Sequence, residues 1–220
     1  MKKNGVFITF EGPDGGGKST HIRLLADHLK ENGCPVVVTR EPGGTALGED
    51  IRGVLLDPRV KNLSLWSELF LYLSCRSQLL EEAIKPALLS KKVVLCDRFI
   101  DATAAYQGFG RKMDINLIND LNKLLIGEFK PDLTVLIDIE PGLGLERSCT
   151  RGNKVDRMEK EKITFHRRVR KGYLGLSKKE PKRFLVINGR DSIEKNGLII
   201  RNAVEKLIIP PFRKGRLGGI

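Results

Sequence analysis

Five short apolar segments, rich in branched side chains, recur along the chain. They lie at residues 6–10, 36–39, 93–96, 133–138 and 184–187. Apolar residues occupy both faces of these segments, which is typical of parallel strands that are covered on both sides. The pattern therefore predicts five buried β-strands.

Helical patterns separate these strands. After a helix that ends at Gly33, they cover about 46–56, 64–85, 101–107, 114–126, a stretch from 141, 156–177 and 192–207. Pro86 is expected to break or restart the long helix. Strands that alternate with helices predict an α/β fold, a doubly wound five-stranded parallel sheet flanked by helices.

The helical segment 64–85 is apolar on more than one face, with Leu65, Trp66, Leu69 and Phe70 in its first two turns. A helix of this kind is buried on more than one side. We therefore expect it to contact the core and also a second copy of the chain, which predicts a homodimer through the 64–85 region.

A glycine-rich loop follows the first strand and precedes the first helix. Residues 12–19 read Gly-Pro-Asp-Gly-Gly-Gly-Lys-Ser, a match to the P-loop pattern G-x-x-x-x-G-K-[ST]. Its backbone N–H groups and the helix N-terminus favour an anion, Lys18 reaches the β/γ-phosphates, and the Ser19 hydroxyl can ligate Mg²⁺. The loop predicts a nucleoside triphosphate site and a P-loop NTPase fold. The residues expected to bind ATP are Gly12, Pro13, Asp14, Gly15, Gly16, Gly17, Lys18, Ser19 and Thr20.

Two further charged motifs end predicted strands, where open α/β sheets bind ligands. Arg40-Glu41 precedes Pro-Gly-Gly after the second strand, and Asp97-Arg98 ends the third. An aspartate in this place commonly organises Mg²⁺, and an arginine beside it can clamp a phosphate. The alternatives, an ordinary turn and a surface ion pair, remain open from pattern alone.

Composition limits the class of protein. A chain of 220 residues suits one domain, and no apolar run is long enough to span a membrane. The short polar start resembles no secretory signal, so we expect a cytoplasmic protein. The four cysteines are far apart, which argues against zinc. The net charge of +12 fits either nucleic-acid binding or a pocket for an anionic small ligand, and we favour the second because no nucleic-acid module is evident.

Taken together, these motifs resemble thymidylate kinase. The resemblance rests on the glycine loop, Thr39 to Thr45, Asp97-Arg98-Phe99 and the Ala-Tyr-Gln-Gly run 105–108, in this order and at these separations. It runs from Val6 to about Asn188 and implies transfer of the ATP γ-phosphoryl group to dTMP, giving dTDP and ADP, with Mg²⁺.

The resemblance also implies roles for single residues. Lys18, Asp97 and Arg98 would be catalytic, with Asp97 and Ser19 organising Mg²⁺ partly through water. Asp14 would accept a hydrogen bond from the deoxyribose 3′-OH. The residues expected to bind dTMP are Asp14, Arg40, Phe70, Arg76, Arg98, Thr103, Tyr106 and Gln107.

Three of these residues would select the nucleotide. Phe70 would stack on thymine, and Arg76, which has donors only, would suit the 4-oxo group of thymine rather than the 4-amino group of cytosine. Tyr106 would occupy the space that a ribose 2′-OH needs. This set argues against the alternative of a UMP, CMP or AMP kinase. A P-loop regulatory ATPase is a more distant alternative.

The loop has glycines at 15 and 16 where some family members have an arginine. The chain therefore resembles the bacterial type, whose catalytic arginines lie in a lid, here about 147–157. Arg151 and Arg157 are the candidates, with Arg157 favoured because Asp156 to Glu159 reads as a helix start. We expect a single kinase domain over 1–208, followed by a basic tail over 209–220.

Overall fold

The computed structural model describes residues 4–150 and 155–212. It contains one sheet of five parallel strands in the order β2-β3-β1-β4-β5. The strands are β1 (Val6–Glu11), β2 (Val36–Arg40), β3 (Val93–Asp97), β4 (Leu133–Asp138) and β5 (Phe184–Asn188). The predicted α/β fold is therefore confirmed, and β1, which leads into the glycine loop, lies at the centre of the sheet.

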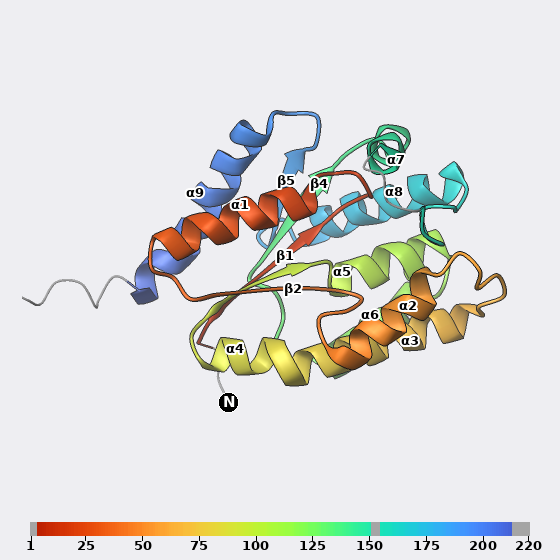
Figure 1. Cartoon of the computed structure of the whole chain (residues 1–220), viewed down its shortest axis with the longest axis horizontal. Helices are drawn as coiled ribbons and strands as arrows, with labels where there is room; N and C mark the ends of the chain where they lie inside the picture. The colour runs from red at the N-terminus through yellow and green to blue at the C-terminus, as the bar shows by residue number, and fades with distance from the viewer. Residues whose placement is uncertain (1–3, 151–154, 213–220) are drawn as a thin grey trace, which may run out of the picture.

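Helices cover both faces of this sheet (Figure 1). Alternate side chains of β1 point to opposite sides, because successive residues of a strand face opposite ways. Ile8 and Phe10 pack with α1 and α9, whereas Phe7 packs with the long helix before β3. The helices are α1 (Lys18–Glu31), α2 (Ala46–Leu56), α3 (Leu65–Leu79), α4 (Lys85–Leu89), α5 (Ile100–Thr103), α6 (Ile115–Ile126), α7 (Pro141–Cys149), α8 (Ile163–Lys179) and α9 (Ile193–Phe212), and the π-helical segments are η1 (Leu80–Ile84) and η2 (Ala104–Gly110).

The long helix restarts at Pro86, one of the two outcomes expected there, although the chain does not leave the helical conformation. The π-helical segment η1 follows α3 directly, and α4 then carries Pro86 in its first turn. Proline is tolerated in a first turn, and the wider π-helical turn changes the hydrogen-bond pattern just before it. The chain is therefore helical from Leu65 to Leu89.

The segment before α8 also differs from expectation. Asp156 and Glu159 do form the reciprocal hydrogen bonds of a capping box, but they close a single turn, and α8 begins only at Ile163. The Arg157 N–H donates to the Leu56 carbonyl at 3.0 Å, which holds the turn against α2 instead of extending it into α8. The predicted helix start at Asp156 is wrong for this reason.

The predicted boundary between domain and tail also changes. Helix α9 continues past Ile208 to Phe212, so a division at residue 209 would fall inside a helix. Residues 213–220 of the predicted tail lie outside the described residues. Over the described residues, no helix is long and apolar enough to cross a membrane.

Candidate active site

The glycine loop joins the carboxyl end of β1 to α1. Gly15 has a φ of +72°, and a Cβ there would collide with the Gly144 carbonyl of α7. A side chain at this position would therefore be strained both by the positive φ and by the collision, and these two effects exclude an arginine. Gly17, with a φ of +91°, immediately precedes α1. The tight turn leaves the N-terminus of α1 open toward the cavity in front of it.

Lys18 lies folded into this loop. Its Nζ donates to the carbonyls of Gly12 and Pro13, at 3.1 and 2.9 Å. Burial, with a smaller effect from the Arg98 charge, lowers the pKa of Lys18 to about 8. Phosphate oxygens beside this ammonium would reverse that effect, because an opposite charge favours the charged form.

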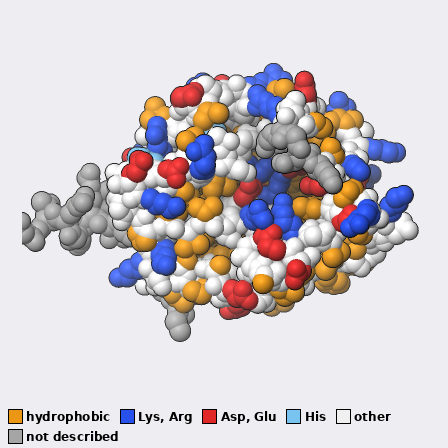
Figure 2. All heavy atoms as spheres, in the orientation of Figure 1, with side chains coloured by type: hydrophobic (Ala, Val, Ile, Leu, Met, Phe, Trp, Pro, Cys, Tyr) orange, Lys and Arg blue, Asp and Glu red, His pale blue; other side chains and the backbone are white. Residues whose placement is uncertain are grey.

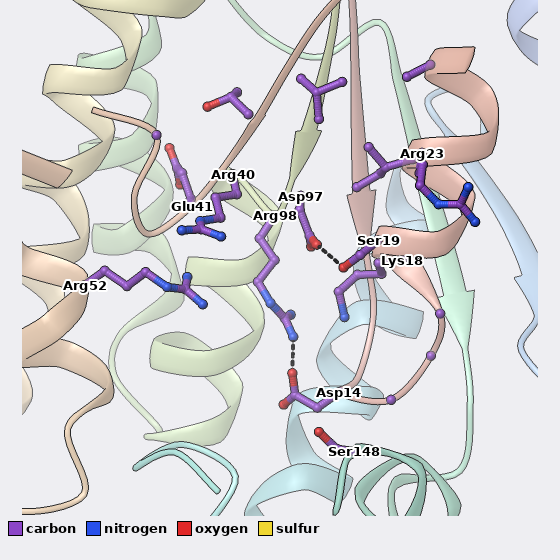
Figure 3. Close-up of a pocket in the computed structure, with 18 of the residues that line it drawn as sticks. Asp14, Lys18, Ser19, Arg23, Arg40, Glu41, Arg52, Asp97, Arg98 and Ser148 are labelled. Atoms are coloured by element: carbon purple, nitrogen blue, oxygen red, sulfur yellow. Dashed lines mark hydrogen bonds and ion pairs between the residues drawn. The ribbon is translucent and has the colours of Figure 1, made fainter. Parts of the chain in front are cut away.

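Ser19 and Asp97 meet in front of the loop. The Ser19 hydroxyl donates to Asp97 Oδ2 at 3.0 Å, and Figure 3 shows the two side chains facing one another beside Lys18. A hydroxyl and a carboxylate are hard oxygen donors, which is the set that Mg²⁺ takes together with waters and phosphates. The pair predicted from the sequence is therefore brought together and fits this ion.

A cavity of about 910 Å³ opens over the loop and over the carboxyl ends of β2 and β3. Lys and Arg side chains gather in a hollow near the middle of the face in Figure 2. The cationic groups of this lining include Lys18, Arg40, Arg52 and Arg98. Such a concentration of positive charge is suited to phosphate groups.

Arg98 is held in place from several sides. Its backbone has a φ of +69°, a conformation that non-glycine residues rarely adopt and that neighbouring structure must maintain. Its guanidinium donates to the Gly12 carbonyl and the Tyr173 hydroxyl and pairs with Asp14, and it lies 4.9 Å from the centre of the Tyr106 ring. Arg98 is thus fixed between the glycine loop and the pocket beside it.

The carboxylates around Arg98 respond to it differently. Although burial opposes it, the charges of Arg98 and Lys18 hold the pKa of Asp14 at about 2, so Asp14 is ionised at neutral pH. Glu11 lies deeper, where burial and the charge of Asp101 raise its pKa to about 8 despite Arg98. Glu11 accepts hydrogen bonds from Tyr173 and from the Phe99 N–H.

A second cavity of about 100 Å³ adjoins the first, and Asp14, Arg52 and Arg98 line both. Asp14 accepts a hydrogen bond of 2.9 Å from the Tyr106 hydroxyl at the junction. Of the predicted acceptor residues, the structure brings Asp14, Arg76, Arg98, Thr103, Tyr106 and Gln107 to this second cavity, and Arg40 to the first.

Arg76 lies at the closed end of the second cavity and is 1% exposed. Its Nε and Nη2 bond the Glu41 carboxylate, Nη2 also donates to Thr103 Oγ1 at 2.8 Å, and Nη1 donates to Asn122 at 2.6 Å. A guanidinium has five N–H donors, and one on Nη1 is left for a ligand. These hydrogen bonds explain how an arginine stays buried in a helix rich in apolar residues.

The structure does not bring Phe70 to either cavity. Phe70 is 52% exposed and stacks on Trp66, with ring centres 5.8 Å apart. Tyr72 lines the second cavity instead. Tyr72 lies one helical turn before Arg76 and shares its face, whereas six residues carry Phe70 to a different face. The prediction for Phe70 is wrong, and the i, i+4 spacing from Arg76 was the signal that pointed to Tyr72.

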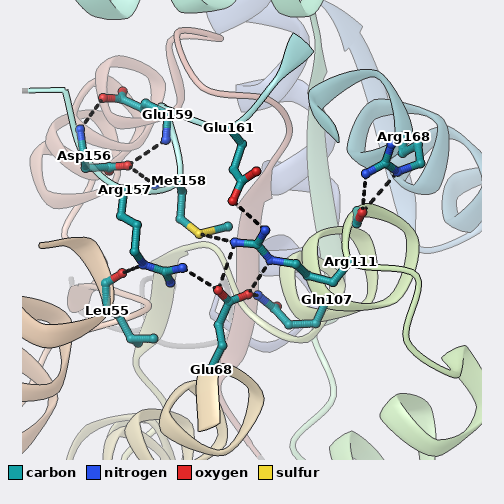
Figure 4. A network of polar contacts seen from close by, with 11 residues as sticks. Leu55, Glu68, Gln107, Arg111, Asp156, Arg157, Met158, Glu159, Glu161 and Arg168 are labelled. Carbon is teal, nitrogen blue, oxygen red and sulfur yellow. Dashed lines mark hydrogen bonds and ion pairs between the residues drawn. The ribbon is translucent and has the colours of Figure 1, made fainter. Parts of the chain in front are cut away.

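Arg157 is also placed differently from expectation. Its Nε donates to the Leu55 carbonyl and its Nη1 to Glu68, both at 2.7 Å, and it lines neither cavity (Figure 4). Arg147 donates to the Gly189 carbonyl at 2.9 Å. The hydrogen bonds of these two arginines go to residues outside the glycine loop. Arg151 lies outside the described residues.

Two features of the site escaped the sequence reasoning. Arg52 of α2 lines both cavities and donates to the Pro42 carbonyl at 2.8 Å, and only the turn between β2 and α2 brings it there. A further cavity of about 470 Å³ lies at the glycine loop and includes Arg147 and the loop after β5. A single arginine in an amphipathic helix and a loop without a motif give no local signal.

Comparison with known proteins agrees with this geometry. A thymidylate kinase family model matches residues 10–197. The thymidylate kinase of Geotalea uraniireducens is 47% identical over 205 residues, which cover 91% of this chain and 96% of the relative. The chain belongs to the thymidylate kinase family. It is accordingly an enzyme, a nucleotide-binding kinase.

Further members of the thymidylate kinase family show how completely the chain is covered. The thymidylate kinase of Pelotomaculum thermopropionicum is 44% identical over 211 residues, 96% of this chain and 97% of the relative. The crystal structure of thymidylate kinase from Ehrlichia chaffeensis superposes with a TM-score of 0.74 at 38% identity and covers 92% of this chain and 99% of its own. The glycine loop, Arg98 and the second cavity therefore lie within a fold that the family shares.

Proposed function

We propose that the described residues form two adjoining sites for the phosphorylation of dTMP, the activity of this chain's family. One site binds the phosphoryl donor and the other binds the acceptor. ATP and Mg²⁺ occupy the larger cavity, dTMP occupies the smaller one, and the products are ADP and dTDP. The observation that carries this proposal is the junction of the two cavities at Asp14 and Arg98.

On the donor side, the glycine loop and the N-terminus of α1 bind the triphosphate. Lys18 leaves its two carbonyl partners to contact the β/γ-phosphates, and Ser19 and Asp97 hold Mg²⁺ with water and phosphate oxygens. Mg²⁺ held by these two residues would neutralise charge that develops during transfer. The adenine extends into the cavity beside Arg147.

On the acceptor side, Arg98 and Arg40 bind the 5′-phosphate and Asp14 receives the 3′-hydroxyl. Tyr106 lies against the sugar, where its ring takes the space of a 2′-hydroxyl. Thymine lies among Tyr72, Arg76, Thr103 and Gln107, with the remaining Arg76 N–H directed at the 4-oxo group.

The reaction needs no general base. The attacking atom is a phosphate oxygen that is ionised at neutral pH, so catalysis is positioning and charge stabilisation. Two phosphate groups would otherwise repel each other at bonding distance, which explains the cationic groups at the junction.

The test is an ADP-release assay with dTMP, dUMP, UMP, CMP and AMP as acceptors at saturating ATP and Mg²⁺. We expect dTMP to give the highest kcat/KM and to stimulate ADP release strongly above the rate without acceptor. Equal rates with AMP or UMP would indicate a different nucleotide kinase, and no stimulation by dTMP would contradict the proposal.

We also propose that the chain acts as a cytoplasmic homodimer. Exposed apolar side chains follow the outer faces of α2, α3 and α6, namely Leu47, Val54, Leu65, Trp66, Phe70, Leu117 and Leu124. Contiguous apolar surface on a monomer marks an interface. Burial in a dimer interface would explain why the stacked rings of Trp66 and Phe70 are exposed on the monomer.

The dimer is tested by mass in solution at micromolar concentration. We expect a dimer for the native chain and a monomer for Trp66→Glu. Val186→Glu is the matched control, because Val186 is equally exposed but lies on β5, far along the sheet from α3, and it should leave the dimer intact. A monomeric native chain would contradict this part of the proposal.

A further inference from the structure

Glu68 of α3 is buried and surrounded by donors. It is 1% exposed, yet its two oxygens accept four hydrogen bonds (Figure 4). Arg111 binds it with two parallel bonds, from Nε at 3.1 Å and Nη2 at 3.0 Å, and Arg157 Nη1 adds a third at 2.7 Å. Two guanidinium groups around one carboxylate keep it ionised.

The fourth donor to Glu68 is Gln107 of η2, whose Nε2 lies 2.9 Å from Glu68 Oε1. Gln107 is also 1% exposed and lines the second cavity. An ionised carboxylate only accepts hydrogen bonds, so it fixes which end of the glutamine amide faces it. The NH₂ end must face Glu68, and among the hydrogen bonds of the described residues the Gln107 side-chain oxygen, Oε1, takes part in none.

We propose that Glu68 is a specificity-determining positioning residue, which turns the Gln107 amide so that only its oxygen is offered to the base in the second cavity. An acceptor there suits a pyrimidine whose N3 carries a hydrogen, as in thymine and uracil. The same acceptor disfavours binding of a base whose N3 is itself a hydrogen-bond acceptor. This inference rests on the proposed function, because it assigns the second cavity to the base of the acceptor nucleotide.

The arginines that hold Glu68 give this device its rigidity. Although burial opposes it, the hydrogen bonds and charges of Arg111, Gln107 and Arg157 lower the pKa of Glu68. Arg111 is itself fixed by Glu161 at 2.5 Å, and Arg157 by the Leu55 carbonyl. The amide is therefore oriented by a network that joins α2, α3, η2 and the turn before α8, and Arg157 serves this network rather than the reacting phosphates.

The test compares dUMP, which has a hydrogen at N3 and a 4-oxo group, with the 5′-monophosphate of 2′-deoxy-2-pyrimidinone nucleoside. Because Arg76 stays in place in every variant, the contribution of N3 is the change that each variant makes in the preference between the two compounds. The second compound has an acceptor at N3 and only hydrogen at position 4, so it lacks the 4-amino group that Arg76 would also reject. Both compounds lack the 5-methyl group. The quantity measured is the ratio of their kcat/KM values, in which changes common to both cancel.

In Glu68→Gln the residue can donate as well as accept, so the Gln107 amide can turn over. We expect the preference for dUMP over the probe to fall roughly tenfold, mostly through better use of the probe, as one hydrogen bond replaces one clash of acceptors. Arg111→Lys is the matched control, because it alters the same network while Glu68 stays charged and Gln107 stays oriented. Its ratio should equal that of the native chain.

Gln107→Leu keeps the proposal testable if Glu68→Gln does not fold, because it leaves Glu68 with both arginines. It removes the oxygen from the cavity, so the preference should fall through poorer use of dUMP. An unchanged ratio in either folded variant would overturn the inference. A native chain that phosphorylates neither dTMP nor dUMP would instead contradict the proposed function.

Discussion

The glycine loop and the network around Glu68 both arrange charged groups, but the sequence specifies them in different ways. The loop uses consecutive residues from Gly12 to Ser19, so its strand, turn and helix follow from local preferences. The network joins side chains from α3, η2 and the turn before α8, and it includes a backbone carbonyl of α2. A contiguous motif therefore reveals a binding site in the sequence. Which distant side chains complete the site depends on the helix face that each of them occupies.

The largest effect should come from the loop. Lys18→Ala removes the ammonium group of the glycine loop, and we expect kcat to fall by roughly 10³-fold, the scale of a lost charge contact to a transferring phosphoryl group. Circular dichroism and the melting temperature should change little. A variant with native kcat would show that the loop does not hold the reacting phosphates.

The next effect separates two arginines of the predicted lid. Because Arg157 is bound by Glu68 and Leu55, we expect Arg157→Ala to cost about 1–3 kcal/mol of stability and to change kcat less than tenfold. Arg151→Ala should lower kcat by roughly 10³-fold if Arg151 supplies the arginine finger. Thermal unfolding and kcat, measured on both variants, decide between them, and the reverse pattern would return the catalytic role to Arg157.

A smaller effect distinguishes two aromatic side chains of α3. Tyr72 lines the second cavity and Phe70 does not. Tyr72→Ala should raise the KM for dTMP roughly tenfold, since stacking of a base on an aromatic ring is worth about 1–3 kcal/mol. Phe70→Ala should leave the KM within twofold at a protein concentration that maintains the dimer. A larger rise for Phe70→Ala would show that the cavity rearranges around the base.

The smallest effect is a pH dependence. Lys18 has a pKa of about 8 before nucleotide binds, and the bound phosphates raise it. Binding therefore takes up a proton as the pH passes 8, and affinity for ATP should fall roughly fourfold between pH 7 and 8.5. Calorimetry in buffers of different ionisation enthalpy measures the proton directly. Lys18→Arg, whose guanidinium stays charged, should lose this dependence.

The fold and most of the site could be predicted because their signals are local. The five strands and the residues of η2 follow from runs of neighbouring residues. Ser19 and Asp97 are 78 residues apart, but each belongs to a local motif at the carboxyl end of a parallel strand, and such ends meet at one edge of the sheet. Phe70 was misplaced because the distance to Arg76 along the chain was considered without the helical phase. Arg157 was misplaced because its partner, Glu68, is 89 residues away in the sequence. No local sequence pattern indicates a contact over such a separation. The position of Arg52 beside both cavities was missed for the same reason.

In the proposed reaction, the γ-phosphoryl group passes from ATP to dTMP at the junction of the two cavities. The most direct measurement follows γ-³²P-labelled ATP incubated with dTMP, Mg²⁺ and the native chain. We expect the label to enter dTDP and little inorganic phosphate to form. Label released as inorganic phosphate while dTMP stays unchanged would contradict it and would make the chain an ATPase.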